Sequence, residues 1–322
     1  MAKNSNLHAA KVAKNDEFYT MLTDIEKEMS HYKDFFKGKV VYCNCDDARE
    51  SNFFKYFSKN FEFLGLKKLI TTGYKAEGKG VVLIYEGDKN GNRKVEDDEI
   101  VVRQLEGSGD FRSEECIEFL KEADVVVTNP PFSLFREYVK QLMDYGKKFI
   151  LIGNMNAITY KEIFPYIKNN ELWLGESGIK DMSFKVPSYY EEKSCRFWID
   201  ENGQHWRSLG NACWYTNVEH TKRHTPIDLY KRYSNEYKHY DNYDAIECGK
   251  VCEIPIDYNG VIGVPITFLD KYCPEQFEIV GCTESEGKGF SNGLWDENSG
   301  VAQPLVSQKR VYKRIFIKRK LS

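Results

Sequence analysis

Four consecutive residues, Asn129-Pro130-Pro131-Phe132, combine the groups that could hold a planar amine. Asn129 offers a carboxamide oxygen, and Pro130 offers a backbone carbonyl on a residue whose φ is fixed. Phe132 offers a flat aromatic face. Two acceptors and one ring can bind the two N–H bonds and the π-face of an amino-substituted base. Acceptors placed where positive charge develops would favour the attacking form of that nitrogen without a general base.

The run before this tetrapeptide, residues 124–128, is typical of a short buried β-strand. Proline cannot continue a central ladder, so the strand ends there and the tetrapeptide lies beyond its carboxyl end. Ligands bind at this edge in open α/β sheets. An ordinary strand stop, with Phe132 filling the core, is the alternative. We favour a functional turn, because the tetrapeptide resembles the catalytic motif of amino-methyltransferases that use S-adenosylmethionine.

The composition indicates a globular protein. With 322 residues, 41% hydrophobic and 30% charged, the chain can bury one large core or two modest ones. No window approaches the apolar length of a membrane span, and the polar start is not a signal peptide. The nine cysteines show no C-x-x-C spacing. We therefore expect a reducing, cytoplasmic setting, no membrane association and no metal.

The net charge of −3 does not by itself indicate a nucleic-acid partner, but its distribution is uneven. Basic residues alternate with apolar ones near the end of the chain. This pattern fits either a solubilising tail or a strand with basic flanks that could face phosphates. The basic residues are Lys309, Arg310, Lys313, Arg314, Lys318, Arg319 and Lys320.

The periodicity predicts strands that alternate with helices, as in βαβ units. A polar, basic stretch at 220–226 separates this pattern from a tyrosine-rich remainder, which predicts a division into residues 1–220 and 221–322. Strands are expected at 39–45, 68–72, 124–128 and 148–154, a hairpin at 81–85 and 100–103, and later strands at 182–187 and 211–216 around an inserted hairpin.

The motifs, in this order, resemble the adenine-specific DNA methyltransferases of the EcoRI modification type. Phe18-Tyr19-Thr20 is similar to that family's amino-terminal cofactor motif. The segment 41–47 resembles its first strand and cofactor loop, and Gly109-Asp110-Phe111 resembles the motif that meets the adenine of the cofactor. The resemblance therefore implies the following cofactor-binding residues: Phe18, Tyr19, Thr20, Asn44, Asp46, Asp110, Phe111 and Asn129.

The resemblance also implies a fold and an activity. The fold would be a doubly wound, mostly parallel seven-stranded sheet, the class I S-adenosylmethionine-dependent methyltransferase fold. Residues 1–220 would form this domain and residues 221–322 a target-recognition region. The enzyme would transfer a methyl group from S-adenosylmethionine to N6 of an adenine flipped out of double-stranded DNA. It would act as a monomer and could be paired with a restriction endonuclease.

Two positions depart from the usual methyltransferase pattern. No glycine occurs between Gly38 and Gly65, where a glycine-rich turn normally lets the backbone approach the cofactor. The second strand ends in Thr72-Gly73-Tyr74 rather than in a ribose-binding carboxylate. Asp46, Asp47 and the start of the following helix would have to replace the glycine turn.

A flipped adenine needs a second aromatic wall opposite Phe132. Phe184 is our first candidate and Trp214 the second, since both follow the catalytic motif on predicted late strands. The alternative for each is an ordinary core aromatic.

Other activities remain compatible with the tetrapeptide. The same amino-methyl transfer could act on cytosine N4, on RNA or on a protein glutamine. A catalytically silent nucleic-acid binder on the same scaffold is a further alternative, although the intact motif at 129–132 disfavours it.

Overall fold

The computed structural model describes residues 19–186, 188, 196–283, 291 and 293–320, without the side chains of Tyr19, Asp46, Lys180 and Asp181. The chain divides into two compact units. Unit 1 takes in Met1–Asn154 and Ile179–Val218, and unit 2 takes in Met155–Gly178 and Glu219–Ser322. Unit 2 therefore includes a segment, Met155–Gly178, from within residues 1–220. Among the described residues, no helix is long and apolar enough to cross a membrane.

Unit 1 is built around four parallel strands. Each lies where the sequence predicts a strand, and their apolar runs suit burial on both faces. β2 pairs with β3 and with β6, and β6 pairs with β7. Because all four run the same way, their carboxyl ends share one edge of the sheet. The strands are β2 (Val40–Asp46), β3 (Lys68–Gly73), β6 (Val125–Thr128) and β7 (Lys148–Asn154).

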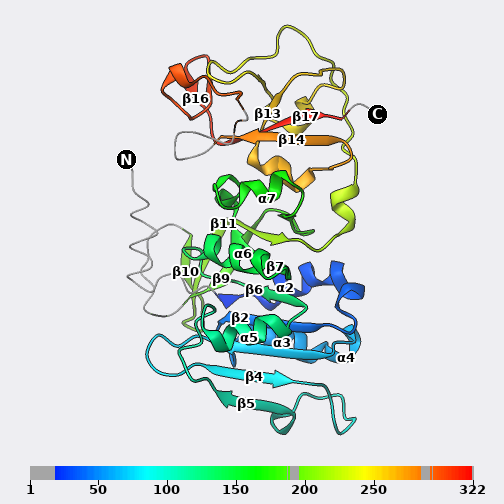
Figure 1. The fold of residues 1–322 in the computed structure, drawn as a ribbon, viewed down its shortest axis with the longest axis vertical. Coiled ribbons are helices and arrows are strands. Elements are labelled where there is room, and N and C mark those ends of the chain that lie inside the picture. Colours follow the sequence, from blue (N-terminus) through cyan, green and yellow to red (C-terminus); the bar gives the residue numbers. More distant parts are fainter. Residues whose placement is uncertain (1–18, 187, 189–195, 284–290, 292, 321–322) are drawn as a thin grey trace. The chain divides into compact units, whose positions relative to one another are not determined.

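Antiparallel strands extend this core on both sides, so the sheet is mixed (Figure 1). Beside β3, the predicted hairpin forms from β4 and β5, and beside β7 the path continues through β11 and β9 to β1. The path β1-β9-β11-β7-β6-β2-β3-β4-β5 has more strands than the seven expected, because β1 and the complete hairpin both join it. The added strands are β4 (Val81–Tyr85), β5 (Ile100–Gln104), β11 (His205–Thr216), β9 (Lys180–Lys185), β1 (Tyr19–Thr20) and β10 (Phe197–Ile199), which pairs with β11.

Helices cover both faces of this sheet. On one face Phe53 of α3 packs edge-on against Trp214, with ring centroids 6.4 Å apart. On the other face Phe135 of α6 lies 5.0 Å from Tyr215, the next residue along β11. Alternate residues of one strand thus contact opposite helical layers. The helices are α2 (Leu22–Met29), η1 (Ser30–Phe36), α3 (Asn52–Lys59), α4 (Phe61–Leu64), η2 (Asp97–Glu99), α5 (Glu114–Glu122) and α6 (Phe135–Asp144).

Unit 2 contains a four-stranded sheet in the order β12-β13-β17-β14. Its aromatic core includes Tyr243 and Phe316, whose ring centroids are 4.8 Å apart. The strands are β8 (Trp173–Leu174), β12 (Ile246–Glu247), β13 (Ile262–Pro265), β14 (Phe277–Cys282), β15 (Leu305–Val306), β16 (Lys309–Arg310) and β17 (Arg314–Arg319). The helices are η3 (Met155–Thr159), α7 (Phe164–Lys168), η4 (Thr221–His224), η5 (Val251–Glu253), η6 (Ile266–Lys271) and η7 (Glu297–Ser299).

The basic end of the chain is a strand, β17, but not all of its charges face solvent. Arg314 is buried and forms a two-point ion pair with Glu247, with Nη2–Oε1 and Nε–Oε2 distances of 2.7 and 3.0 Å. The Tyr240 hydroxyl donates to the same carboxylate. Lys309 and Arg310 of β16 are exposed. Arg314 therefore stabilises unit 2 and is not available for a phosphate.

We expect the change Arg314→Met to lower the free energy of unfolding by about 3–5 kcal/mol, because it leaves a buried carboxylate without its cation. Urea unfolding of the full chain, followed by circular dichroism, measures this. The exposed Arg310 provides the control, and Arg310→Met should change stability by less than about 0.5 kcal/mol. Equal midpoints for the two variants would contradict the structural role of Arg314.

Candidate active site

The register of the parallel strands brings two predicted motifs together. Val41 and Tyr42 of β2 are paired with Val125 and Val126 of β6. Continuing this register places Asn44 beside Thr128, the residue before Asn129. The Thr128 hydroxyl donates a hydrogen bond to the backbone carbonyl of Asn44. The segment predicted to bind the cofactor and the tetrapeptide thus lie side by side at the carboxyl edge.

The tetrapeptide forms a turn between β6 and α6. Asn129 and Pro130 are buried, and the backbone N–H of Leu134 donates to the Pro131 carbonyl at 2.9 Å, which closes the turn. Phe132 is half-buried and packs against the core of unit 1. These positions agree with the predicted strand stop. They leave part of the Phe132 ring accessible to a ligand.

Strand β1 brings the amino-terminal motif to this region of the sheet. Thr20 is paired with Phe184 of β9, and Asn52 Nδ2 at the start of α3 donates to the Thr20 carbonyl at 2.7 Å. Among the described residues, Thr20 Oγ1 is buried and has no hydrogen-bond partner. A buried hydroxyl of this kind usually has a partner, so a ligand atom is a natural candidate. Phe18 and the Tyr19 side chain, both predicted to bind the cofactor, lie outside the part of the chain that the structure describes.

The first turn replaces the missing glycine with an unusual backbone conformation. Cys45 has φ = 67°, in the left-handed region that glycine normally occupies, and the β2–β3 register shifts at this point. The Asp47 carboxylate then accepts the N–H groups of Arg49 and Glu50 at 2.9 and 3.1 Å. The backbone therefore turns as in a glycine loop. The sequence gives no signal for this role of Cys45, and the Asp46 side chain is not described.

Glycine is required instead in the loop that carries Asp110 and Phe111. Gly109 has φ = +81°, and a Cβ atom there would lie 2.4 Å from the Gly73 carbonyl at the end of β3. This close approach places Asp110 and Phe111 beside the carboxyl edge. The Asp110 carboxylate receives two N–H groups of Arg112, at 2.8 and 2.6 Å, and these hydrogen bonds raise the pKa of the guanidinium.

Tyr138 of α6 connects these motifs, and sequence reasoning missed it. Its hydroxyl donates to Asn44 Oδ1, and its ring packs edge-on against Phe111 with centroids 5.0 Å apart. The side chain is 1% exposed. Burial raises the pKa of Tyr138, so the hydroxyl stays protonated and remains a donor. One side chain therefore contacts both the carboxyl end of β2 and the loop before α5.

Phe184 and Trp214 do not offer a ring face to solvent. Phe184 is 0% and Trp214 is 2% exposed, and both belong to the hydrophobic core of unit 1. Trp214 packs against Phe53. Neither ring can stack on a base unless core residues move, so in this conformation the structure favours the alternative of ordinary core aromatics. Strand alternation in the sequence could not separate the two roles.

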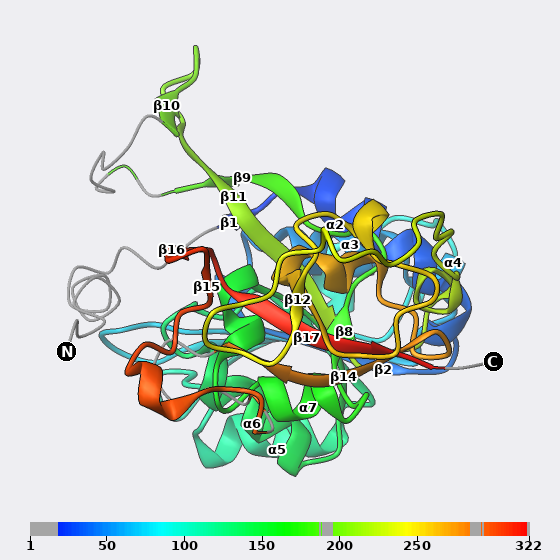
Figure 2. The ribbon, with the colours of Figure 1, turned by 90° about the horizontal axis from the view of Figure 1, so that it is seen from above.

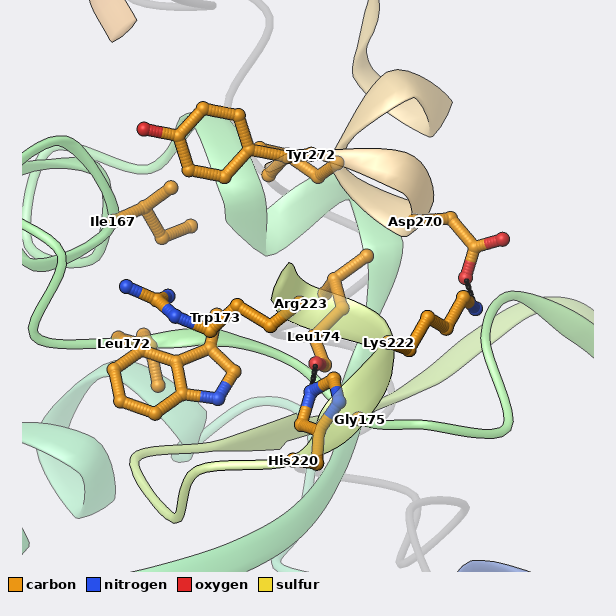
Figure 3. Close-up of a pocket in the computed structure, with 11 residues that line it drawn as sticks. Ile167, Leu172, Trp173, Leu174, Gly175, His220, Lys222, Arg223, Asp270 and Tyr272 are labelled. Carbon is orange, nitrogen blue, oxygen red and sulfur yellow. Dashed lines mark hydrogen bonds and ion pairs between the residues drawn. The ribbon is translucent and has the colours of Figure 1, made fainter. Parts of the chain in front are cut away.

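Unit 2 contains a small cavity that none of the predicted site residues lines (Figure 3). The Arg223 guanidinium lies 3.8 Å from the centre of the Trp173 ring, and burial lowers the pKa of Arg223. Lys222 Nζ pairs with Asp270 at 2.6 Å, and His220 contacts the Leu174 carbonyl at 2.9 Å. All of these contacts lie within unit 2.

Comparison with known proteins agrees with the motifs. Residues 6–320 match the model of a family described as adenine-specific methyltransferase EcoRI. The type II methyltransferase M.EcoRI of Escherichia coli is 47% identical over 99% of this chain and 98% of its own. M.MgeORF184P of Mycoplasma genitalium is 37% identical over 98% of both chains, and M.MpnI of Mycoplasma pneumoniae is 38% identical over 97% of both chains.

We expect Tyr138→Phe to weaken binding of S-adenosylmethionine about fivefold. The change keeps the contact between the ring and Phe111 but removes the hydrogen-bond donor to the buried Asn44 Oδ1. Losing this hydrogen bond costs about 1 kcal/mol or more and lets the end of β2 move. Isothermal titration calorimetry measures the dissociation constant.

Tyr215→Phe is the matched control for this change. Its hydroxyl donates to the Asn154 carbonyl at 2.9 Å, at the end of β7, and not to Asn44. Both variants should lose stability, but only Tyr138→Phe should lose cofactor affinity. Equal affinities in the two variants would show that the Tyr138 hydroxyl is merely structural.

Proposed function

The chain belongs to the EcoRI family of adenine-specific methyltransferases, and we propose that it transfers a methyl group from S-adenosylmethionine to N6 of an adenine flipped out of double-stranded DNA. The observation that carries the proposal is the position of Asn129-Pro130-Pro131-Phe132. The tetrapeptide lies at the carboxyl edge of β6, directly beside Asn44 near the carboxyl end of β2. Methyl donor and target amine would therefore meet at one place.

The residues at this edge fit S-adenosylmethionine, whose sulfonium supplies an electrophilic methyl group. The buried Thr20 Oγ1 has no partner among the described residues and could bind a polar group of the cofactor. The left-handed turn at Cys45 lets backbone approach closely. Phe111 would pack against the adenine ring of the cofactor, and Asp110 would lie at the edge of that ring. For Phe18, Tyr19 and Asp46 the proposal rests on the family motif alone.

The chain's own groups would perform the transfer by positioning and electrostatics. Asn129 Oδ1 and the Pro130 carbonyl would each accept one N–H of the adenine amine, and Phe132 would stack on the base. The amine is a poor nucleophile because its lone pair is delocalised into the ring. The two acceptors stabilise the positive charge that develops as the nitrogen attacks the methyl group, and the surplus proton is lost afterwards.

The assignment of roles to the two parts of the chain is also a proposal. Residues 1–220 would act as the methyltransferase domain, with the doubly wound parallel core of that fold, and residues 221–322 would recognise the target. The enzyme would act on DNA as a monomer and could be paired with a restriction endonuclease of the same specificity. Phe184 or Trp214 could still form the second base wall if the core opens when the base enters.

Methyl transfer to cytosine N4, RNA or a glutamine is the alternative chemistry, and a silent DNA binder is the alternative without chemistry. Incubation with labelled S-adenosylmethionine and a set of DNA fragments, followed by mapping of the methylated bases, separates all of these. We expect N6-methyladenine at one recurring sequence. Label on cytosine, RNA or protein, or no label with tight DNA binding, would overturn the proposal.

We expect Asn129→Ala to reduce the rate of methyl transfer roughly a hundredfold or more, a loss on the order of 3 kcal/mol from one preorganised acceptor. Cofactor affinity should change little, because the contact strengthens as the amine rehybridises. Single-turnover kinetics with the mapped duplex measures the rate.

Asn92→Ala is the control, because Asn92 is an exposed residue of the β4–β5 connection in the same unit. It should retain the normal rate. Near-normal turnover in a folded Asn129→Ala protein would sink the proposed mechanism.

A further inference from the structure

A narrow hairpin in unit 1 has no evident role in the fold. It consists of β10 and the first part of β11, with Trp198 paired to Trp206. The turn is held by the Asp200 carboxylate, which accepts from the Asn202 and Gln204 N–H groups at 2.9 and 3.0 Å. Trp206 Nε1 also donates to it at 2.8 Å, a bond that lowers the pKa of Asp200. The hairpin is thus an ordered element.

The register fixes where this hairpin projects. β11 pairs with β7 only up to Ala212, which faces Asn154 at the carboxyl end of β7. The earlier residues of β11 therefore continue beyond the carboxyl edge of the parallel strands, and β10 lies away from the sheet (Figure 2). Asn129 lies at the same edge. Thr20 is joined to the hairpin through β9, which pairs with both β1 and β11.

The hairpin exposes apolar surface on both faces. Trp198 is 41% and Ile199 is 54% exposed. Strand alternation places them on opposite faces. The Trp198 and Trp206 rings are nearly parallel, at an interplanar angle of 14° and a centroid distance of 6.4 Å. An exposed Trp198 and an exposed Ile199 on a projecting element indicate a contact surface, because the fold gains nothing from leaving them in water.

Charge around the rings suits a nucleic acid. Lys185 and Arg196 are exposed beside the hairpin, whereas Arg207, opposite Phe197 on β11, is only partly exposed and its Nε and Nη1 atoms are buried. Of the two acidic groups at the turn, Asp200 is held by the internal hydrogen bonds, whereas Glu201 is exposed. The phosphates would therefore face the basic sides of the ribbon and not its turn. β11 is paired on its other side with β9 at Trp206 and Arg207, so β10 is the open edge of this ribbon and the strand that a DNA groove would meet first.

We propose that the β10–β11 hairpin contacts duplex DNA and that Trp198 stacks on exposed base or sugar surface next to the target adenine. This inference rests on the proposed function, because a duplex that delivers a base to Asn129 must pass this edge of the sheet. Aromatic and apolar wedges commonly support a duplex whose base is unstacked. The hairpin would thus support the duplex that the base has left, while Phe132 would hold the extruded base.

The first test uses Trp198→Ala, with a fluorescein-labelled duplex that contains the mapped site and anisotropy at fixed salt. Loss of one stacked ring should raise the dissociation constant about tenfold, and Trp198→Phe should recover most of the affinity. Binding of S-adenosylmethionine should not change in either variant. Trp198→Ala with wild-type affinity for the duplex would overturn the inference.

Phe63→Ala is the matched control. Phe63 is also an exposed aromatic of unit 1, at 71%, but it lies on α4, which leads into the amino end of β3 at the opposite edge. Its removal should leave DNA affinity unchanged. If wild-type protein neither binds nor methylates the duplex, the proposed function fails. If wild-type protein does both and Trp198→Ala matches it, only the hairpin assignment fails.

A charge-reversal pair at Ile199 decides the matter even if Trp198→Ala misfolds. Ile199 is exposed on the other face of the hairpin, so Ile199→Lys and Ile199→Glu should both fold. Against phosphates, the lysine variant should bind the duplex about tenfold more tightly than the glutamate variant, and the difference should shrink as salt rises. If the two variants bind the duplex equally at low salt, the hairpin does not contact DNA, and a protein partner becomes the better explanation for its exposed surface.

Discussion

The site depends on one short pairing, that of β2 with β6. The two strands are in register through Val41–Val125 and Tyr42–Val126, and the Thr128 hydroxyl bonded to the Asn44 carbonyl continues that register to the strand ends. A shift by one residue would turn every side chain to the other face and separate Asn44 from the turn at residues 129–132. The buried runs of both strands oppose such a shift. The position of the tetrapeptide relative to the end of β2 thus follows from hydrophobic burial.

The sequence predicts most strands of unit 1 and the turn that ends β6 at residues 129–132, because β-branched runs and Pro-Pro act locally. It does not predict Tyr138, since the hydrogen bond to Asn44 and the contact with Phe111 join segments far apart in the chain. Nor does it predict the left-handed φ of Cys45, because cysteine has no preference for that region. The sequence thus allows the family motif to be recognised, but it does not show that Cys45 adopts the conformation that glycine usually provides.

Burial explains the remaining differences between expectation and structure. Alternation along a strand assigns residues to faces, but it does not tell which face a helix covers. Phe184 and Trp214 therefore looked like candidates for a base wall and are core residues of the α3 face. Likewise, the alternation of basic and apolar residues in β17 does not show that Arg314 is buried. Its partner Glu247 lies on β12. Charge counts along the sequence overestimate the surface available to phosphate.

Strand β11 links the catalytic core to the proposed DNA contact within unit 1. Its second half is fixed by consecutive pairs with β7, from Ala212–Asn154 to Thr216–Ile150, and is buried. Its first half carries the hairpin. Because a strand that is locked at one end in a packed sheet moves little, a duplex held at Trp198 would be placed at a defined distance from Asn129. The geometry of methyl transfer requires such a fixed distance, since misplacement by about 1 Å can cost roughly a hundredfold in rate. Target recognition elsewhere in the chain would then select the sequence, while β11 would set the approach of the base.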